Sequence, residues 1–233
     1  MHNYVVLDLE TLHSADACRM CGFPRADWAT LGPVPSCVDR GGHQVIGWED
    51  HAALGLSVGC YWDAVDQQIH WFDGATLAQT MTQLIEQQPL LVTFNGYQFD
   101  LPLMATLARN ELSVSHLQAW QRLAAQSYDI LREIWLVDLV NKFAKGLNSL
   151  AALAEANDLG RKTGMGAQAP QDWAAGRWAS VLNYCQQDVY LTKALFDLVC
   201  AGEGIKRSNG SVLLPKPVCE RSEEQVSITP LGR

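Results

Sequence analysis

The segment Tyr4–Thr11 constrains the fold most, because it has the pattern of a buried strand that ends in two carboxylates. The apolar run over residues 4–9 suits a strand covered on both faces, and the two-residue period of a strand puts Asp8 and Glu10 on the same face. Two ionised carboxylates side by side repel each other unless their pKa values rise or a cation lies between them. We therefore expect a divalent metal ion here. The alternative is that both acids lie just past the strand, in solvent.

Composition indicates one domain with an insertion and a tail. The chain has 233 residues, 48% of them hydrophobic and 18% charged, which suits one well-buried domain of generous size. Its start, Met1-His2-Asn3, has no basic leader, and no apolar run is long enough to span a bilayer, so we expect a soluble, cytoplasmic protein. Seven widely spread cysteines favour reduced thiols or a metal site over a disulfide framework.

The net charge of −8 argues against a protein that holds nucleic acid on a broad basic surface. Clustered metal-binding carboxylates contribute to this negative charge, and a nuclease that releases its product needs only a local basic track. The candidate residues for such a track are Arg161, Lys162, Arg177, Lys193, Lys206 and Arg207.

Strands alternate with helices along the chain, which predicts an α/β sandwich. Residues 12–51 lack a regular period, so we expect an irregular excursion from the first strand. The remaining predicted elements are a hairpin over residues 54–62 and 68–72, a helix over 75–87, a buried strand over 90–94, a helix over 97–110, a strand ending at 127–129, helices over 130–143, 149–157 and 178–200, and a small hairpin over 205–218 before a frayed end.

Two further carboxylates stand out for independent reasons. Asp100 falls in the first turn of a helix that follows a buried strand, and Asp188 falls on the apolar stripe of the last long helix, one turn after Tyr184. Strand ends and the helices that follow them share one crevice of an open sheet, so these acids can converge with Asp8 and Glu10. Hard oxygen ligands favour Mg²⁺ or Mn²⁺. Taken singly, the alternatives are a helix-dipole acid, a salt-bridged acid and an ordinary core tyrosine.

Three motifs resemble those of the tyrosine branch of the DEDD 3′–5′ exonucleases. The matching segments are Asp8-Leu9-Glu10, Phe94-Asn95-Gly96-Tyr97-Gln98-Phe99-Asp100 and Tyr184-Cys185-Gln186-Gln187-Asp188. Within that superfamily the chain is most similar to small stand-alone predicted exonucleases related to the proofreading domain of family B polymerases. The resemblance implies a ribonuclease-H-like mixed five-stranded sheet flanked by helices. Residues 1–200 would be the exonuclease domain, with an inserted loop at 12–51, and residues 201–233 a C-terminal hairpin and tail.

The resemblance also implies a reaction, namely two-metal hydrolysis of phosphodiester bonds from the free 3′ end of a single-stranded nucleic acid, with DNA favoured over RNA. By this resemblance, Tyr184 would position or help deprotonate the attacking water. The four acids Asp8, Glu10, Asp100 and Asp188 would hold two Mg²⁺ or Mn²⁺ ions, and Thr11, Asn95 and Phe99 would contact the substrate. The alternatives are a catalytically silent binding module, in which an acid would be lost, and an endonuclease, which would cut circular substrate.

The excursion after Glu10 departs from the pattern of that family, because it is longer than expected. Within it, Cys18, Cys21, Cys37 and His43 have the C-x₂-C-x₁₅-C-x₅-H spacing of a zinc knuckle. This spacing predicts a structural Zn²⁺ site. The alternative is a loop with unligated cysteines, since a single C-x-x-C pair is common and no second pair supports it.

Overall fold

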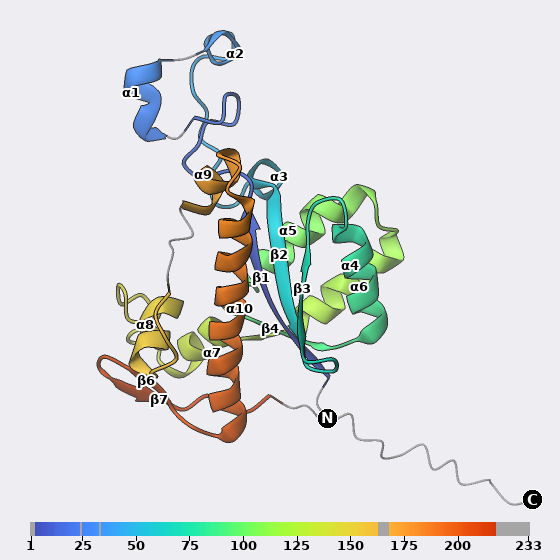
Figure 1. Cartoon of the computed structure of the whole chain (residues 1–233), viewed down its shortest axis with the longest axis vertical. Coiled ribbons are helices and arrows are strands. Elements are labelled where there is room, and N and C mark those ends of the chain that lie inside the picture. Colours follow the sequence, from blue (N-terminus) through green and yellow to red (C-terminus); the bar gives the residue numbers. More distant parts are fainter. Residues whose placement is uncertain (1–2, 24, 33, 163–167, 218–233) are drawn as a thin grey trace, which may run out of the picture.

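The computed structural model describes residues 3–23, 25–32, 34–162 and 168–217, and it contains a five-stranded sheet with helices on both faces (Figure 1). The sheet has the order β3-β2-β1-β4-β5, in which β1, β2 and β3 are antiparallel neighbours and β1, β4 and β5 run parallel. Its strands are β1 (Tyr4–Thr11), β2 (Leu56–Asp63), β3 (Gln68–Phe72), β4 (Leu90–Thr93) and β5 (Tyr128–Asp129). This mixed sheet confirms the predicted α/β, ribonuclease-H-like class.

Helices cover both faces of the sheet, and each face has its own apolar core. One face packs against α3 (His51–Leu54), α4 (Leu77–Gln87), α5 (Asp100–Leu107) and α6 (Val114–Ala125). The other packs against α7 (Ile130–Val137), α8 (Leu150–Ala156), α9 (Ala169–Ala174) and α10 (Trp178–Ala201), together with the hairpin of β6 (Ile205–Arg207) and β7 (Gly210–Val212). No helix in the described part of the chain combines the length and apolar composition needed to cross a membrane.

The alternation of side chains along β1 decides where its carboxylates point. Val5, Leu7 and Leu9 belong to the core on the α4–α6 face, whereas Val6 belongs to the core beneath α10. Because the period of a strand is two, Asp8 and Glu10 follow Val6 onto the α10 face. The two acids therefore point from the central strand toward the longest helix of the described chain.

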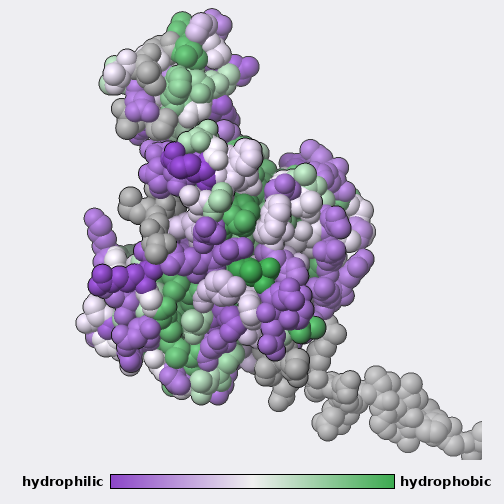
Figure 2. All heavy atoms as spheres, viewed as in Figure 1, coloured by the Kyte–Doolittle hydropathy of each residue, from purple (hydrophilic) through white to green (hydrophobic). Residues whose placement is uncertain are grey.

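Residues 18–44 form a small lobe that projects beyond the end of the sheet (Figure 1). The lobe carries α1 (Trp28–Leu31) and α2 (Pro35–Val38), and in the space-filling view it stands above the body as a knob of its own (Figure 2). The expectation of an irregular excursion over residues 12–51 was therefore wrong in part. Short helices and backbone hydrogen bonds, including an antiparallel bridge between Cys18 and Val45, give this segment a defined path.

Several other element limits differ from those predicted, for local reasons. The helix predicted over residues 97–110 begins at Asp100, because the Asn95 carbonyl accepts hydrogen bonds from the N–H groups of Gln98 and Phe99 and closes a turn first. The helix predicted to reach residue 143 ends at Val137, because the Asp138 carboxylate accepts from the Asn141 N–H and forms a turn instead. Helices α6 and α9 were not predicted.

The C-terminal prediction is confirmed only for the hairpin Ile205–Val212. The predicted frayed end, from residue 218 onward, lies outside the described residues. The hairpin packs into the same core as α8 and α10 through Ile205 and Val212. The Tyr128 hydroxyl also donates to the Pro215 carbonyl at 2.8 Å, which ties the segment after the hairpin to β5.

Candidate active site

A cleft of about 830 Å³ opens where the end of β1, the turn between β4 and α5, and the middle of α10 meet. The Cys185 thiol on α10 donates to the Asp8 carbonyl at 3.4 Å and fixes the helix against the strand at this level. All the residues that the sequence nominated for catalysis and substrate contact line this one cleft: Asp8, Glu10, Thr11, Asn95, Phe99, Asp100, Tyr184 and Asp188. The fold thus joins three distant segments of the chain at one place.

Three of the acids form a tight group within the cleft. Asp8 and Glu10 from β1 and Asp188 from α10 each supply one carboxylate oxygen, and these oxygens lie within 4.8 Å of one another. Asp8 Oδ2 and Asp188 Oδ1 are buried, and neither has a hydrogen-bond partner among the described residues. Buried, unpartnered carboxylate oxygens that converge in this way can hold a divalent cation.

Asp100 lines the same cleft outside this tight group. It is the first residue of α5 and is only 5% exposed. The Gly96 Cα comes so close to Asp100 that a Cβ added there would lie 2.7 Å from Asp100 Oδ2, and Thr93 side-chain atoms crowd the same space. A side chain at position 96 would therefore displace this carboxylate.

The pKa values of the cleft acids are raised, because these side chains lie close together and away from water. Burial, and then the charges of Asp188, Asp100 and Glu10, raise the pKa of Asp8 well above its usual range. Burial and the charge of Asp188 likewise raise the pKa of Glu10 well above its usual range. For Asp100, burial and the charge of Asp129 raise the pKa to about 8, despite hydrogen bonds from backbone N–H groups. Such pKa shifts are common at functional sites, where the protein itself does not neutralise the charges of the clustered side chains.

Lys162 is the cation that the structure brings to this group. Its Nζ donates to Asp188 Oδ2 at 2.5 Å and lies 4.6 Å from the centre of the Tyr184 ring. Burial raises the pKa of Asp188, and the Lys162 charge opposes that rise. Sequence analysis included Lys162 only as one of six candidate basic residues, because the segment around it has no periodicity that would place it.

The Tyr184 side chain lies beside the acids, with its hydroxyl buried. Burial and the charges of Asp188, Glu10 and Asp8 raise the pKa of Tyr184, so the hydroxyl keeps its proton at neutral pH. The hydroxyl is close enough to Asp188 to help lower the pKa of that acid, but it makes no hydrogen bond of normal geometry to a described residue. It is therefore available to a group that enters the cleft.

Asp129 positions one wall of the cleft and was not singled out from the sequence. It is 1% exposed, and its carboxylate accepts four hydrogen bonds. The donors are the Thr93 hydroxyl at 3.0 Å and the N–H groups of Asn95 at 3.1 Å, Tyr97 at 2.9 Å and Arg132 at 2.9 Å. One carboxylate thus fixes the turn that carries Asn95 and caps α7. The available signal was an Asp directly before an amphipathic helix.

The six residues predicted to supply a basic track do not all line the cleft. Of those six, Lys162 lines the cleft, whereas the other five lie beside acids elsewhere. The five pairs are Arg161 with Glu155, Arg177 with Asp172, Lys193 with Asp197, Lys206 with Asp158 and Arg207 with Asp138. Arg207 has a structural role, since it also donates to the side chain of Asn148, which lines the cleft and was likewise not singled out.

A different basic surface borders the cleft at Asn95. It is a groove of about 220 Å³, lined by aromatic and cationic side chains that include Tyr97, Arg132, Trp135 and Lys142. The Arg132 guanidinium lies 4.2 Å from the Tyr97 ring centre, and Lys142 Nζ lies 5.0 Å from that of Trp135. We call this surface the aromatic groove.

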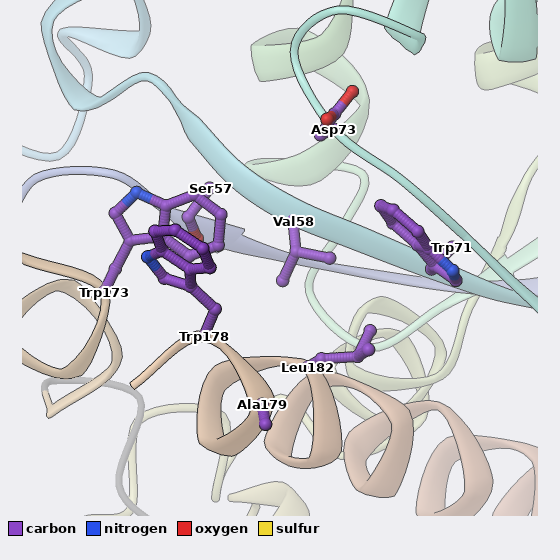
Figure 3. A pocket seen from close by; sticks show the side chains of 8 residues that line it. All are labelled: Ser57, Val58, Trp71, Asp73, Trp173, Trp178, Ala179 and Leu182. Carbon is purple, nitrogen blue, oxygen red and sulfur yellow. The ribbon is translucent and has the colours of Figure 1, made fainter. Parts of the chain in front are cut away.

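A further pocket lies away from the acids and serves as a contrast. It has a volume of about 360 Å³ and is lined by Trp71 on β3, Trp173 and Trp178 beside the start of α10, and Val58 on β2 (Figure 3). Its single acid, Asp73, accepts hydrogen bonds from the N–H groups of Ala75 and Thr76 and so stabilises its own turn. The described lining of this pocket contains no cluster of acids, so the larger cleft is the better candidate for an active site.

Comparison with known proteins identifies a family for the chain. No curated protein matches the chain. A family model described as a predicted 3′-5′ exonuclease related to the exonuclease domain of PolB matches residues 65–204. That range contains Asp100, Tyr184 and Asp188, while Asp8 and Glu10 precede it. The match spans more than half of the sequence, so the chain belongs to this family of predicted 3′-5′ exonucleases related to the exonuclease domain of PolB.

Proposed function

We propose that this protein is a metal-dependent 3′–5′ exonuclease that removes nucleotides from the 3′ end of single-stranded nucleic acid, DNA in preference to RNA. One observation carries the proposal, namely that the four acids and the tyrosine of the three motifs line a single cleft. We assign the activity to residues 1–200. The hairpin that follows supports the cleft, because Arg207 on β6 bonds to Asn148 in the cleft wall.

The chemistry of the cleft suits two Mg²⁺ or Mn²⁺ ions. The donor set consists of carboxylates, and the unpartnered oxygens of Asp8 and Asp188 point to missing positive charge. We propose that Asp8, Glu10, Asp100 and Asp188 hold the ions. When bound, the ions would supply positive charge beside the reacting phosphate and the leaving 3′-oxygen.

We assign Tyr184 to positioning the attacking water. Its raised pKa keeps the hydroxyl protonated, which favours a hydrogen-bonding role over proton abstraction. The ring is held between α10 and the Lys162 ammonium, so the hydroxyl has a fixed direction. Lys162 holds Asp188 by its Oδ2 atom and thereby leaves Oδ1 free for a ligand.

The rim of the cleft suits a terminal nucleotide. Phe99 meets Trp48 edge-on at 5.8 Å between ring centres and meets His51 in the same manner at 5.8 Å. Trp48 is 68% exposed, so one face of this aromatic group is open to a base. Stacking on aromatic rings tolerates any base, as an enzyme that removes successive nucleotides requires. We assign Thr11, Asn95 and Phe99 to contact with this nucleotide.

We further propose that the strand leaves the cleft along the aromatic groove. The groove shares Asn95 with the cleft, and its two cations, Arg132 and Lys142, form no salt bridge with a described carboxylate. Cations interleaved with aromatic rings bind single strands by pairing with phosphates and stacking on bases. Such a local surface allows an acidic protein to bind a polyanion.

The central test uses 5′-labelled and 3′-labelled single strands of DNA and of RNA. With Mg²⁺ or Mn²⁺ we expect the 3′ label to appear at once as a mononucleotide and the 5′ label to pass through a descending ladder. A circular single strand should stay intact, and DNA should be degraded faster than RNA. Release of 5′-terminal nucleotides, cutting of circles, or no hydrolysis of any substrate would each contradict the proposal.

The groove has its own test in the double variant Arg132→Gln/Lys142→Gln. Removing two phosphate contacts should raise KM for long strands by about tenfold and leave kcat nearly unchanged, with a weaker salt dependence. The control Arg122→Gln/Lys206→Gln removes the same charge from exposed positions outside the groove and the cleft. Equal effects of the two double variants would remove the groove from the substrate path.

A further inference from the structure

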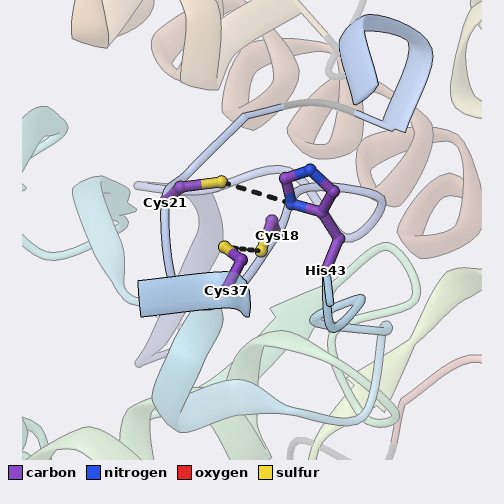
Figure 4. A group of neighbouring side chains, drawn as sticks. All are labelled: Cys18, Cys21, Cys37 and His43. Atoms are coloured by element: carbon purple, nitrogen blue, oxygen red, sulfur yellow. Dashed lines mark hydrogen bonds between the residues drawn. The ribbon is translucent and has the colours of Figure 1, made fainter. Parts of the chain in front are cut away.

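The cysteine and histidine side chains of the projecting lobe converge on one point (Figure 4). Cys18, Cys21, Cys37 and His43 each present one ligand atom, and these four atoms lie within 4.8 Å of one another. Cys18 Sγ and Cys37 Sγ are 3.6 Å apart, and Cys21 Sγ lies 3.5 Å from His43 Nδ1. Two thiolates bound tetrahedrally to zinc, with Zn–S bonds of about 2.3 Å, are ~3.8 Å apart. The spacing therefore matches a tetrahedral site with three sulfurs and one nitrogen.

Backbone turns hold these ligands in place. The Gly22 N–H donates to the Cys18 carbonyl at 2.7 Å, and the Gly42 N–H donates to the Cys37 carbonyl at 2.6 Å. Both glycines have positive φ, 74° and 111°, which other residues adopt at a cost in energy. The Met20 N–H also donates to Cys18 Sγ at 3.4 Å, a contact that orients a metal-binding sulfur.

The orientation of His43 is fixed by a neighbour from α1. The Trp28 ring stacks on the imidazole with 4.6 Å between centres and an angle of 14° between planes. The Trp28 Nε1–H in turn donates to the Phe23 carbonyl at 2.9 Å. This packing directs Nδ1 toward the sulfurs, as Figure 4 shows.

The described side chains of the lobe form no apolar core apart from these ligands. Of the described side chains between residues 18 and 45, only Cys18 and Cys37 are buried, while Val38 is 59% exposed and Val45 is 42% exposed. Units shorter than about 40 residues usually need a metal or disulfides to stay folded. The lobe's thiols are unpaired in the structure, so a metal is the agent that its chemistry offers.

The lobe also connects directly to the cleft. Its two ends run side by side at its base, where the Ile46 N–H donates to the Ala17 carbonyl at 3.0 Å and the Gly47 N–H donates to the Ala15 carbonyl at 2.8 Å. Ala15, Gly47 and Trp48 line the cleft. A metal bound to Cys18 and His43 would therefore join the two segments that form one rim of the cleft.

We infer that Cys18, Cys21, Cys37 and His43 bind one structural Zn²⁺, which holds the lobe folded and fixes the cleft rim that carries Trp48. The site lies outside the segment matched by the exonuclease family, residues 65–204. Zinc binding stands independently of the proposed function, and only its effect on the cleft rests on it. A failure of one is therefore distinguishable from a failure of the other.

The first test is elemental analysis of the full chain purified without added metal. We expect about one zinc per chain, retained on dialysis. His43→Ala should reduce zinc to background, whereas His43→Cys, which keeps four ligands, should retain it. Cys200→Ser changes an exposed cysteine on α10 and should retain zinc as the control. Folded wild-type protein without zinc would overturn the inference, and so would equal loss of zinc in His43→Cys and His43→Ala.

Cobalt provides a readout that does not depend on how the variants fold. Wild-type protein reconstituted with Co²⁺ should show thiolate charge-transfer bands and the intense visible absorption of a tetrahedral site, and one equivalent of Zn²⁺ should abolish both. Spectra of six-coordinate cobalt bound only by oxygen would overturn the inference, because they would place the metal on the carboxylates instead.

The effect of the lobe on the cleft rim has a kinetic test. His43→Ala should raise KM several-fold and lower kcat by much less, since the acids stay in place.

Discussion

The acidic cleft and the Cys/His cluster are both candidate metal sites, but different structures hold their ligands. Asp8 and Glu10 stand on the central strand of the sheet, and Asp188 stands in the middle of a 24-residue helix, so two apolar cores fix all three. Cys18 and Cys37 are themselves the buried centre of their lobe. We therefore expect the fold to form without a metal in the cleft, whereas the proposed zinc in the lobe would take the place of a core.

The two sites also differ in what happens without metal. The cleft acids repel one another and keep raised pKa values, so the metal-free fold carries that strain within a rigid frame. The lobe lacks such a frame in its described part, where only backbone turns and the Trp28 ring hold the ligands, so we expect it to unfold locally when metal is removed. By these two proposals, the cleft would bind exchangeable, reactive ions, whereas the lobe would depend on a resident ion.

The largest expected difference is in hydrogen exchange after metal removal. A strong chelator should expose the amides of residues 18–46 to exchange, with a loss of protection worth several kcal/mol, while β1 and α10 keep theirs. Restoring Zn²⁺, but not Mg²⁺, should return the protection. Mass-spectrometric exchange on the full chain measures both regions in one sample. Equal loss of amide protection in the lobe and in β1 would contradict the expectation that only the lobe depends on its metal.

Asp8→Asn should separate activity from folding in the cleft. Removing one carboxylate of the tight group should lower kcat by ~10³-fold, because the ions supply several kcal/mol of transition-state stabilisation. The same change relieves repulsion, so the metal-free protein should be about 1 kcal/mol more stable to urea. Asp197→Asn, an exposed acid on α10, is the control and should affect neither quantity strongly. Activity of Asp8→Asn near wild type would refute the metal assignment.

Tyr184→Phe should reduce turnover by ~10²-fold with little change in melting temperature, because positioning contacts of this kind are worth that much. Among the described residues the hydroxyl makes no hydrogen bond of normal geometry, so its removal should cost little stability. Tyr190→Phe, on the same helix and 45% exposed, is the matched control. A normal rate together with reduced stability would make Tyr184 a core residue instead.

Much of this architecture follows from local patterns. The apolar runs and turn residues predicted β1 to β4, α4 and α10, and their order predicted an α/β sandwich. The mixed order of the sheet came from the resemblance to the exonuclease family. The period of two put Asp8 and Glu10 on one face, and the helical period put Asp188 on the buried side of its helix, which the structure confirms. The roles of these acids in metal binding and catalysis stay predictions.

Other features depend on contacts that no local pattern contains. Asp129 receives its hydrogen bonds from β4, the following turn and α7, so its importance appears only once β5 lies beside β4. Lys162 reaches Asp188 from a segment without periodicity. The spacing of the cysteines and His43 predicted a zinc site, but only the structure shows that their ligand atoms meet. Helix α6 was missed although Ser113 caps it by accepting from the His116 N–H.

The pH dependence of stability tests, with a smaller expected effect, whether the charges of the cleft acids stay uncompensated in the absence of metal. Burial and the charge of Asp129 raise the pKa of Asp100 to about 8, against ~3.9 for an unfolded Asp. Between these values the folded state keeps a proton that the unfolded state has released. Stability in the absence of Mg²⁺ and Mn²⁺ must therefore fall as pH rises through this window. Asp8, Glu10 and Asp188 act in the same direction, since their pKa values are also raised.

From pH 6 to pH 8 we expect the free energy of unfolding of the wild type to fall by about 1–2 kcal/mol more than that of Asp100→Asn. One proton held only by the folded state changes this free energy by about 1.4 kcal/mol per pH unit. Urea unfolding in buffer treated with chelating resin measures this, because the resin removes Mg²⁺ from the buffer while the zinc proposed for the lobe would stay bound. Adding Mg²⁺ at pH 8 should recover stability in the wild type, since the cation binds the ionised acids. Parallel curves for wild type and Asp100→Asn would mean that Asp100 is already ionised at pH 6. In that case protein groups such as Lys162, which contacts Asp188, would balance the charge of the cleft acids without metal. The cleft and the lobe would then differ less in their need for a metal.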